Sequence, residues 1–193
     1  DRVSRGLGDV YKRQASSLQH QLLLHQQLHP ESTAYNEPVA VAIEPRATEP
    51  VARAALQALV RRHAVLRTSF TLDTKAASFY QCVLPADGFA VPITCCSAPT
   101  TWGAELEREL RIPFDLSAAP PVRAILLQAQ PSRLVVNVHH VAADGESMMM
   151  MRGELFSHCE ALAVQRPPPS LAPLEFEYAE FAVCEHGRED DHG

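Results

Sequence analysis

Two adjacent histidines followed by an aspartate-glycine pair form the segment of this chain best suited to chemistry. His139 and His140 end a largely apolar run that starts at Leu134, and Asp144-Gly145 follow shortly after. An imidazole takes up or releases a proton near neutral pH. The β-branched residues of the run favour a buried strand that ends at the histidines. Successive side chains of a strand point to opposite faces, so only one of the two rings is expected to face a reaction site.

Metal binding is the first alternative for these residues. His25 and His29 have the spacing of a zinc-binding HExxH motif, but Gln26 occupies the place of the glutamate. Two histidines and a carboxylate at 139, 140 and 144 could form an iron site. Strand alternation separates the two rings, however, so we predict no metal site here. Cys95 and Cys96 are expected to be packing residues rather than metal ligands.

The candidate site residues must be positioned by secondary structure, and strands and helices are predicted to alternate along the chain. Strands are expected at 39–44, near 68–70, and at 79–84, 122–128 and 134–140; helices are expected at 49–63, 102–111 and 146–162. The last two strands, with a short turn between them, predict a hairpin. The proline-rich residues 166–173 predict an extended linker. The expected fold class is α/β, a mixed β-sheet with flanking helices.

Charge and composition exclude several classes of function. The chain has 193 residues and a formal net charge of −6. Nucleic-acid binding relies on lysine and arginine contacts with phosphates, so an acidic chain argues against it. No apolar stretch approaches the ~20 residues of a membrane span. The five cysteines form no CxxC pair and are expected to be free thiols in the reducing environment of the cytoplasm.

The pattern HHxxxDG at residues 139–145 resembles that of acyltransferases related to chloramphenicol acetyltransferase. The flanking sequence is similar to one branch, the condensation domains of non-ribosomal peptide synthetases. Residues 16–36 resemble that family's SxAQxRLWxL and PxSxAYN motifs, with Gln21 and Leu23 in place of arginine and tryptophan. Residues 62–70 match RHExLRTxF except for Ala64. The remaining matches are PFDL at 113–116 with Pro120 and Arg123, Ser147 in DGxS, EAL at 160–162 and YAEFA at 178–182.

The resemblance implies amide-bond formation between acyl or peptidyl and aminoacyl groups, each tethered as a thioester to a carrier domain. It assigns the catalytic position to His140, which would either orient the amine and accept its proton or stabilise developing charge. No cofactor is expected in this domain, because the phosphopantetheine arms belong to the partner carrier domains. An adenylation domain is a further expected partner, as is a second, C-terminal lobe.

Structural roles are expected for the other residues of the candidate site. His139 should point into the packed interior. Asp144 is expected to hold its loop through an ion pair, with Arg67 as the first candidate partner and Arg62 as the second. Gly145 would provide either an unusual backbone conformation or close approach of the substrate. Ser147 is interpreted as a helix-start cap rather than a nucleophile.

The ends of the chain set the expected domain boundaries. Residues 4–14 resemble the in-frame translation of a transposase adaptor used in sequencing libraries, so residues 1–14 are interpreted as non-native and without a role in the fold. They carry four basic and two acidic residues, which leaves −8 on the remainder. Residues 15–193 correspond to the N-terminal lobe of a two-lobed fold of the chloramphenicol acetyltransferase type. Family members are roughly twice this long, so a truncated domain, inactive alone, is expected.

Two other functions stay open at this point. The same HHxxxDG pattern occurs in epimerisation domains and in acyltransferases that use coenzyme A. A catalytically silent, condensation-like docking module is the alternative from a different class. The intact His140, Asp144 and Gly145 argue against a silent module, whereas Leu23, Ala64 and Glu146 depart from the usual pattern.

Overall fold

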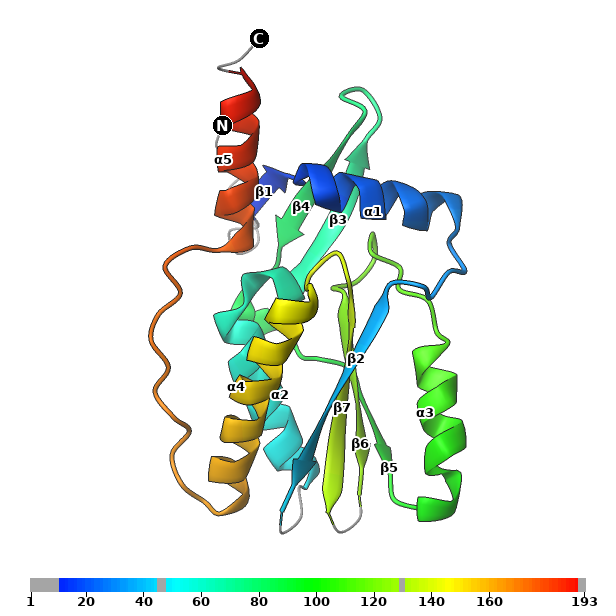
Figure 1. The fold of residues 1–193 in the computed structure, drawn as a ribbon, viewed down its shortest axis with the longest axis vertical. Coiled ribbons are helices and arrows are strands. Elements are labelled where there is room, and N and C mark those ends of the chain that lie inside the picture. Colours follow the sequence, from blue (N-terminus) through cyan, green and yellow to red (C-terminus); the bar gives the residue numbers. More distant parts are fainter. Residues whose placement is uncertain (1–10, 45–47, 129–130, 191–193) are drawn as a thin grey trace.

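The residues that the structure describes form two sheets and five α-helices, which confirms the predicted α/β fold class (Figure 1). The structure, a computed structural model, describes residues 11–44, 48–128 and 131–190. Its strands are β1 (Tyr11–Gln14), β2 (Asn36–Ile43), β3 (Thr68–Asp73), β4 (Ser78–Val83), β5 (Ile93–Cys96), β6 (Val122–Leu127) and β7 (Ser132–His139). Its α-helices are α1 (Ser17–Leu28), α2 (Glu49–Arg62), α3 (Trp102–Leu110), α4 (Gly145–Ala163) and α5 (Tyr178–Asp190). Short 3-10 turns cover Ala64–Arg67, Ala86–Gly88 and Pro99–Thr101.

The larger sheet carries the candidate site on its second strand. Its strand order is β2-β7-β6-β5. β7 pairs antiparallel with both β2 and β6, which confirms the predicted hairpin, while β5 pairs parallel with β6. The sheet is therefore mixed. β7 lies between two neighbours and is buried along nearly its whole length, as its apolar run predicts.

Alternation along β7 divides the core between the two faces of this sheet. Leu134, Val136 and Val138 face α2 and α4, whose buried side chains include Leu56 and Leu155. On the other face, a smaller cluster of residues packs under α3, namely Cys96, Ile125, Leu127 and Val135 with Trp102 and Leu106. Figure 1 shows α2 and α4 together on one side of the sheet and α3 on the other. Burial on both faces fixes the register, because a slip of one residue would exchange the faces.

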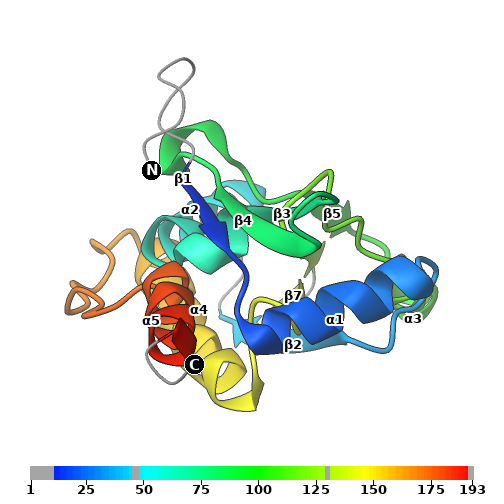
Figure 2. The same ribbon diagram turned by 90° about the horizontal axis from the view of Figure 1, so that it is seen from above.

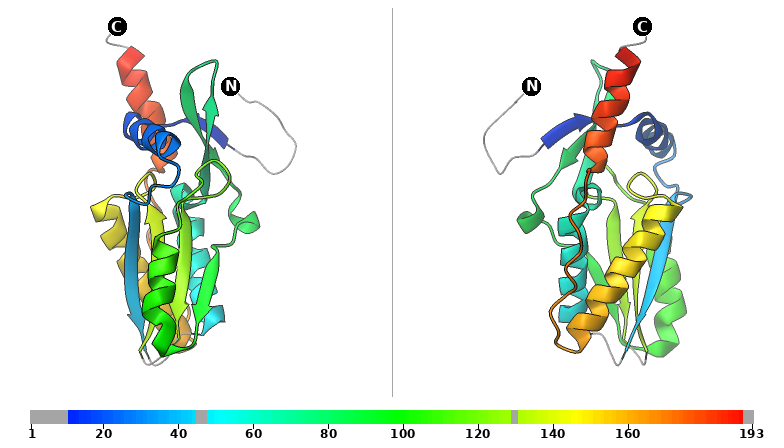
Figure 3. Two further views of the ribbon diagram at one scale, coloured as in Figure 1. Left: turned by 90° about the vertical axis from the view of Figure 1, so that its right-hand side faces the viewer. Right: turned by 60° about the vertical axis from the view of Figure 1, so that its left-hand side comes forward.

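A second sheet, with strand order β1-β4-β3, lies at the same end of the larger sheet as α1 (Figures 2 and 3). Helix α1 was not predicted as a helix. It begins with a capping box in which the Ser16 hydroxyl accepts from the Gln19 N–H and the Gln19 side chain accepts from the Ser16 N–H. The Phe70 N–H of β3 donates to the Leu116 carbonyl, which joins this sheet to the PFDL segment.

Strand β1 corrects the interpretation of the first fourteen residues. Residues 1–10 lie outside the described part of the chain. Tyr11–Gln14 pair with β4 from Tyr11 opposite Val83 to Gln14 opposite Tyr80, and the Gln14 carbonyl accepts from Gln81 Nε2. The expectation that this segment contributes nothing to the fold is wrong for these four residues. Their backbone pairs with β4 whatever the origin of their sequence.

Removing β1 should therefore lower stability. A chain that starts at Ala15 would expose the edge of β4, including the buried Gln81 side chain, and lose the ladder hydrogen bonds. We expect its melting temperature to lie several degrees below that of a chain starting at Tyr11. Thermal unfolding followed by circular dichroism compares the two. Equal melting temperatures would mean that the β1 pairing adds no stability.

Residues 166–177 run without regular secondary structure from the end of α4 to the start of α5, as the proline-rich sequence predicts. They follow the outer side of α2 and α4 (Figure 1). An Arg62 guanidinium nitrogen donates to the Ala172 carbonyl at 2.5 Å, so the helix pair holds this segment at its middle. Among the described residues, no helix is long and apolar enough to cross a membrane.

Candidate functional site

The two histidines point to different surroundings, as strand alternation predicts. His139 is 1% exposed. Its Nδ1 accepts from the Val141 N–H at 3.0 Å, so its Nε2 carries the proton and donates to Gln26 Oε1 at 3.3 Å. The Phe114 ring packs against it edge to face. His139 therefore ties the end of β7 to α1 and to the PFDL segment.

Burial lowers the pKa of His139 from 6.5 to about 4, with smaller contributions from the charges of His140 and His25. The folded chain therefore keeps this ring neutral where the unfolded chain protonates it. Since the unfolded state binds more protons between pH 6.5 and 4, stability falls as the pH falls through that range.

This shift should make unfolding sensitive to mild acid. We expect His139 to make the chain about 2 kcal/mol less stable at about pH 5 than at about pH 7. Urea unfolding at both pH values measures the difference. The His139→Gln variant should lose that part of the pH dependence, and His29→Gln, at an exposed site, should retain it. Equal pH dependence in the wild type and His139→Gln would contradict the prediction.

His140 lies one residue beyond β7, and its side chain is 31% exposed. Its N–H donates to the Tyr35 carbonyl at 2.8 Å, which continues the β2–β7 ladder by one step. The Tyr35 and His140 rings lie parallel, with an interplanar angle of 5° and centroids 6.2 Å apart. The Glu37 Oε1 atom lies 3.9 Å from His140 Nδ1. Tyr35 and Glu37 were not identified from the sequence as neighbours of this ring.

Asp144 and Arg67 do not form the predicted ion pair. Asp144 is the N-cap of α4, where its Oδ1 accepts from the Ser147 N–H at 2.8 Å and hydroxyl at 2.7 Å. The Ser147 hydroxyl bond, then its N–H bond, lowers the pKa of Asp144. Arg67 instead donates to the Val60 and Leu84 carbonyls. The second candidate partner, Arg62, pairs with Glu154 of α4, with Nε and Oε1 2.8 Å apart.

The expectations for Ser147 and Gly145 also need correction. Ser147 lies in the first turn and serves the cap, but Asp144 is the capping residue. Gly145 is the first residue of α4 and does not have a left-handed backbone. An unusual backbone conformation therefore does not explain why a glycine occupies this position. A Cβ added there would meet nothing within 4 Å. Close approach of a substrate stays a prediction for Gly145.

Motif residues far apart in the sequence meet around the loop that follows the histidines. Gln19 Nε2 donates to the Val141 carbonyl at 3.2 Å, and the Ser16 and Tyr178 hydroxyls are 2.9 Å apart. The first motif thus holds the HHxxxDG loop through Gln19, and Ser16 joins this motif to the last one. On the α3 side, Asn36 and Arg123 donate to carbonyls at the end of that helix and the start of PFDL.

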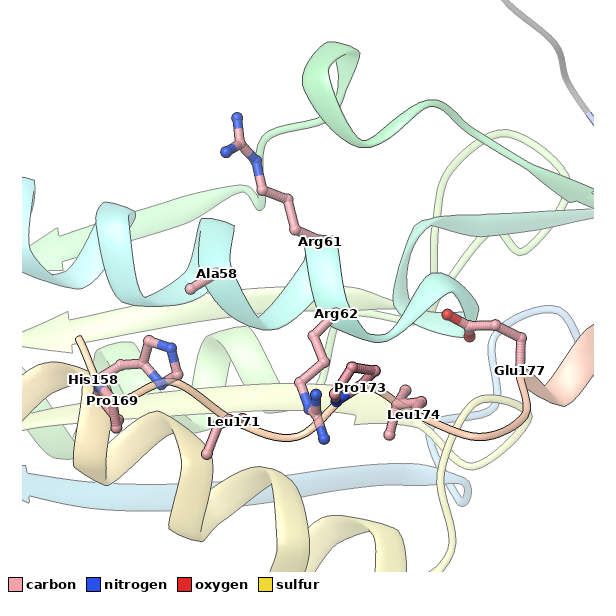
Figure 4. Close-up of a pocket in the computed structure, with 9 residues that line it drawn as sticks. All are labelled: Ala58, Arg61, Arg62, His158, Pro169, Leu171, Pro173, Leu174 and Glu177. Carbon is pink, nitrogen blue, oxygen red and sulfur yellow. The ribbon is translucent and has the colours of Figure 1, made fainter.

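A cavity of about 660 Å³ lies between α1, the smaller sheet and the PFDL segment. Phe70, Phe79 and Phe114 give it apolar walls, and Gln26 and Asp115 give it polar groups. Gln26 and Phe114 also contact His139, so the cavity adjoins the buried histidine. A shallower pocket of about 470 Å³ lies beneath residues 166–177, where Arg62 and Pro173 line it (Figure 4).

Neither alternative metal site is assembled among the described residues. The ring centroids of His25, on α1, and His29, which follows α1, lie 4.9 Å apart. Within the described ranges, no group of three or more histidine, cysteine, aspartate or glutamate side chains could hold a metal ion. The five cysteines, all of which the structure describes, are free.

Comparison with known proteins establishes the family. The sequence profile of the Condensation domain matches residues 12–192. The chain belongs to the condensation-domain family. It is 36% identical over 173 residues to a probable non-canonical non-ribosomal peptide synthetase, CymA, of Salinispora arenicola, and 34% identical over 166 residues to a dimodular non-ribosomal peptide synthase of Bacillus subtilis. These alignments cover 89% and 83% of this chain, but only 2% and 7% of the respective relatives.

Solved structures show the same fold. The X-domain from teicoplanin biosynthesis, in its complex with OxyB, superposes with a TM-score of 0.79 and 26% identity, covering 97% of this chain and 40% of that one. The first condensation domain of the calcium-dependent antibiotic synthetase superposes with a TM-score of 0.72 and 19% identity, covering 94% and 46%. The chain therefore spans less than half of each of these two structures.

Proposed function

We propose that this chain is one lobe of a condensation domain that joins an acyl or peptidyl thioester to an aminoacyl thioester. The observation that carries the proposal is the part-exposed imidazole of His140, held at the end of a buried strand in a condensation-family fold. His139, by contrast, is buried and neutral and therefore serves structure. Asp144 supports the reaction by capping α4 behind the loop.

In the proposed reaction, the acceptor amine attacks the thioester carbonyl of the donor. A C–N bond forms, the C–S bond breaks, and the products are an amide on the acceptor carrier and a free phosphopantetheine thiol on the donor carrier. An α-amino group has an ordinary pKa of about 7.7 to 8.0, so roughly a tenth to a sixth of it is already neutral at about pH 7. His140 accepts the amine proton as the C–N bond forms, and that proton then goes to the leaving thiolate.

The other groups of the reaction come from outside this chain. The thioester activates the acyl group, so the domain needs no cofactor of its own. The second lobe supplies the opposite wall of the reaction channel, and an adenylation domain loads the carrier. The peptide-synthetase relatives support these partners.

The direct test joins residues 11–193 to a condensation-domain second lobe and supplies donor and acceptor carriers loaded with thioesters. Intact-protein mass spectrometry should show the donor acyl group transferred to the acceptor carrier. A folded two-lobed domain that binds both loaded carriers but transfers no acyl group would count against the proposal. Epimerisation would change the stereochemistry of the loaded residue without transfer, and acyltransfer from coenzyme A would proceed without a donor carrier.

A recruiting platform is the second candidate function. It is favoured by the 26% identity to an X-domain that was solved in a complex with OxyB. In this case the face around His140 would bind a partner protein and perform no chemistry. Stable binding of a partner enzyme by the two-lobed domain, with no transfer between loaded carriers, would favour the platform.

A further inference from the structure

Glu37 lies on the same sheet face as His140, at the end of the neighbouring strand. In the β2–β7 register, Asn36 is opposite His139 and Glu37 is opposite Val138. One step further along, Tyr35 is opposite His140, so Glu37 is the diagonal neighbour of His140. Val41 and Ile43, which share the alternation of Glu37, pack in the core cluster beneath α2 and α4. Diagonal cross-strand side chains on one face lie within reach of each other.

The His140 ring packs beside Tyr35, and its Nδ1 atom is available for a hydrogen bond. Tyr35 lies parallel to the ring. The Nδ1 atom is buried and has no hydrogen-bond partner within the described part of the chain, while Glu37 Oε1 lies 3.9 Å away. A buried polar nitrogen without a partner calls for an explanation. Hydrogen bonds at catalytic residues are often long without substrate and shorten when it binds.

The other ionisable groups around His140 do not compete for this position. Asp144 uses its Oδ1 to cap α4. His139 uses its Nδ1 for the Val141 N–H, and the low pKa of His139 keeps that ring uncharged. His25 of α1 packs edge to face with the Tyr35 ring. Among the described residues, the carboxylate that pairs with His140 Nδ1 is therefore that of Glu37, while Asp144 interacts with the His140 charge only as a minor contribution to its own lowered pKa.

We propose that Glu37 is a positioning residue that selects the Nδ1–H tautomer of His140. With the proton on Nδ1, the lone pair is on Nε2, which is the atom that accepts the amine proton. The carboxylate also opposes the positive charge that the ring acquires in that step. This inference rests on the proposed function for its use in catalysis, but the tautomer itself is a property of the chain alone.

The tautomer is measured by nitrogen-15 NMR on the 193-residue protein, with the His140 signals identified by their loss in His140→Ala. The Nδ1–H form should predominate in the wild type and decrease in Glu37→Ala. Glu44→Gln is the matched control, since it removes a carboxylate just beyond the other end of the same strand, where the residue is exposed. An unchanged tautomer ratio in Glu37→Ala, with the fold intact by circular dichroism, would overturn the inference.

The catalytic part is tested in the two-lobed domain. Glu37→Ala should lower kcat by about twofold to fivefold and leave KM for the loaded carriers unchanged, as expected for a half-exposed charge pair. Glu37→Asp should recover part of the loss and Glu44→Gln should show none. A wild-type kcat in Glu37→Ala would reject the positioning role. Full turnover in His140→Ala would instead reject the catalytic role of His140 and leave the tautomer measurement to decide the role of Glu37.

Discussion

Replacing His140 with alanine in the two-lobed domain is expected to lower the rate of amide formation by about 10² to 10⁴. The reason is that the amine loses a proton as the C–N bond forms, and without the imidazole that proton goes to water. Mass spectrometry of the acceptor carrier after single turnover measures the rate directly. Binding of the loaded carriers should stay unchanged, because the substitution removes a part-exposed ring and leaves the backbone ladder to Tyr35 intact.

His29→Ala is the matched control, since it removes an exposed imidazole that follows α1. It should have no effect on turnover. Full activity in His140→Ala would show that another group takes the proton. An equal loss in both variants would indicate a general effect of histidine removal rather than proton transfer at residue 140.

The largest effect on stability is expected at Glu154, which joins α4 to the end of α2. Its carboxylate pairs with Arg62 Nε at 2.8 Å and lies 2.6 Å from His63 Nε2, and its side chain is only 10% exposed. Arg62 continues from this pair to the Ala172 carbonyl, and Figure 4 shows its side chain extending toward residues 166–177. Glu154→Ala leaves the Arg62 charge largely buried without its partner, which should cost about 3 to 5 kcal/mol.

Urea unfolding of Glu154→Ala, Arg62→Ala and the double variant measures this coupling. The two single losses should sum to far more than the loss in the double variant, because either substitution breaks the same interaction. Asp87→Ala is the control. It breaks the exposed ion pair between Asp87 and Arg61, which is the residue before Arg62 on α2, and it should change stability little. Additive losses at Glu154 and Arg62 would contradict the coupling.

Local patterns in the sequence predicted the elements that carry the site. The apolar runs of β6 and β7 and the helical spacing in α2 and α4 each reflect burial of a single element, which a short window of sequence records. Strand alternation also separated His139 from His140 correctly. The motifs indicated the family, which the comparisons confirm. Helices α1 and α5 were not predicted. The buried face of α1 includes Gln19 and Gln26, and Phe181 and Val183 of α5 are exposed, so apolar residues alone do not mark the buried faces of these helices.

Contacts between distant residues were less predictable. Asp144 was expected to pair with Arg67, but the first turn of α4 offers Asp144 unpaired N–H groups three residues away, and a local cap forms without ordering another element. Arg67 satisfies buried carbonyls instead. β1 was missed because residues 1–14 were interpreted as non-native, and its partner strand β4 lies far away in the sequence. Glu37 was missed because only the β2–β7 register brings it near His140.

The position of β2 also bears on how this chain avoids association with its own copies. β2 is one of the two edge strands of the larger sheet among the described residues, and an open strand edge can template the pairing of another chain. Pro38, in its first half, has no N–H to donate, and Glu37 beside it adds a charge. Both features hinder edge-to-edge aggregation. The strand that brings a carboxylate to His140 therefore also protects the sheet from growing beyond its own chain.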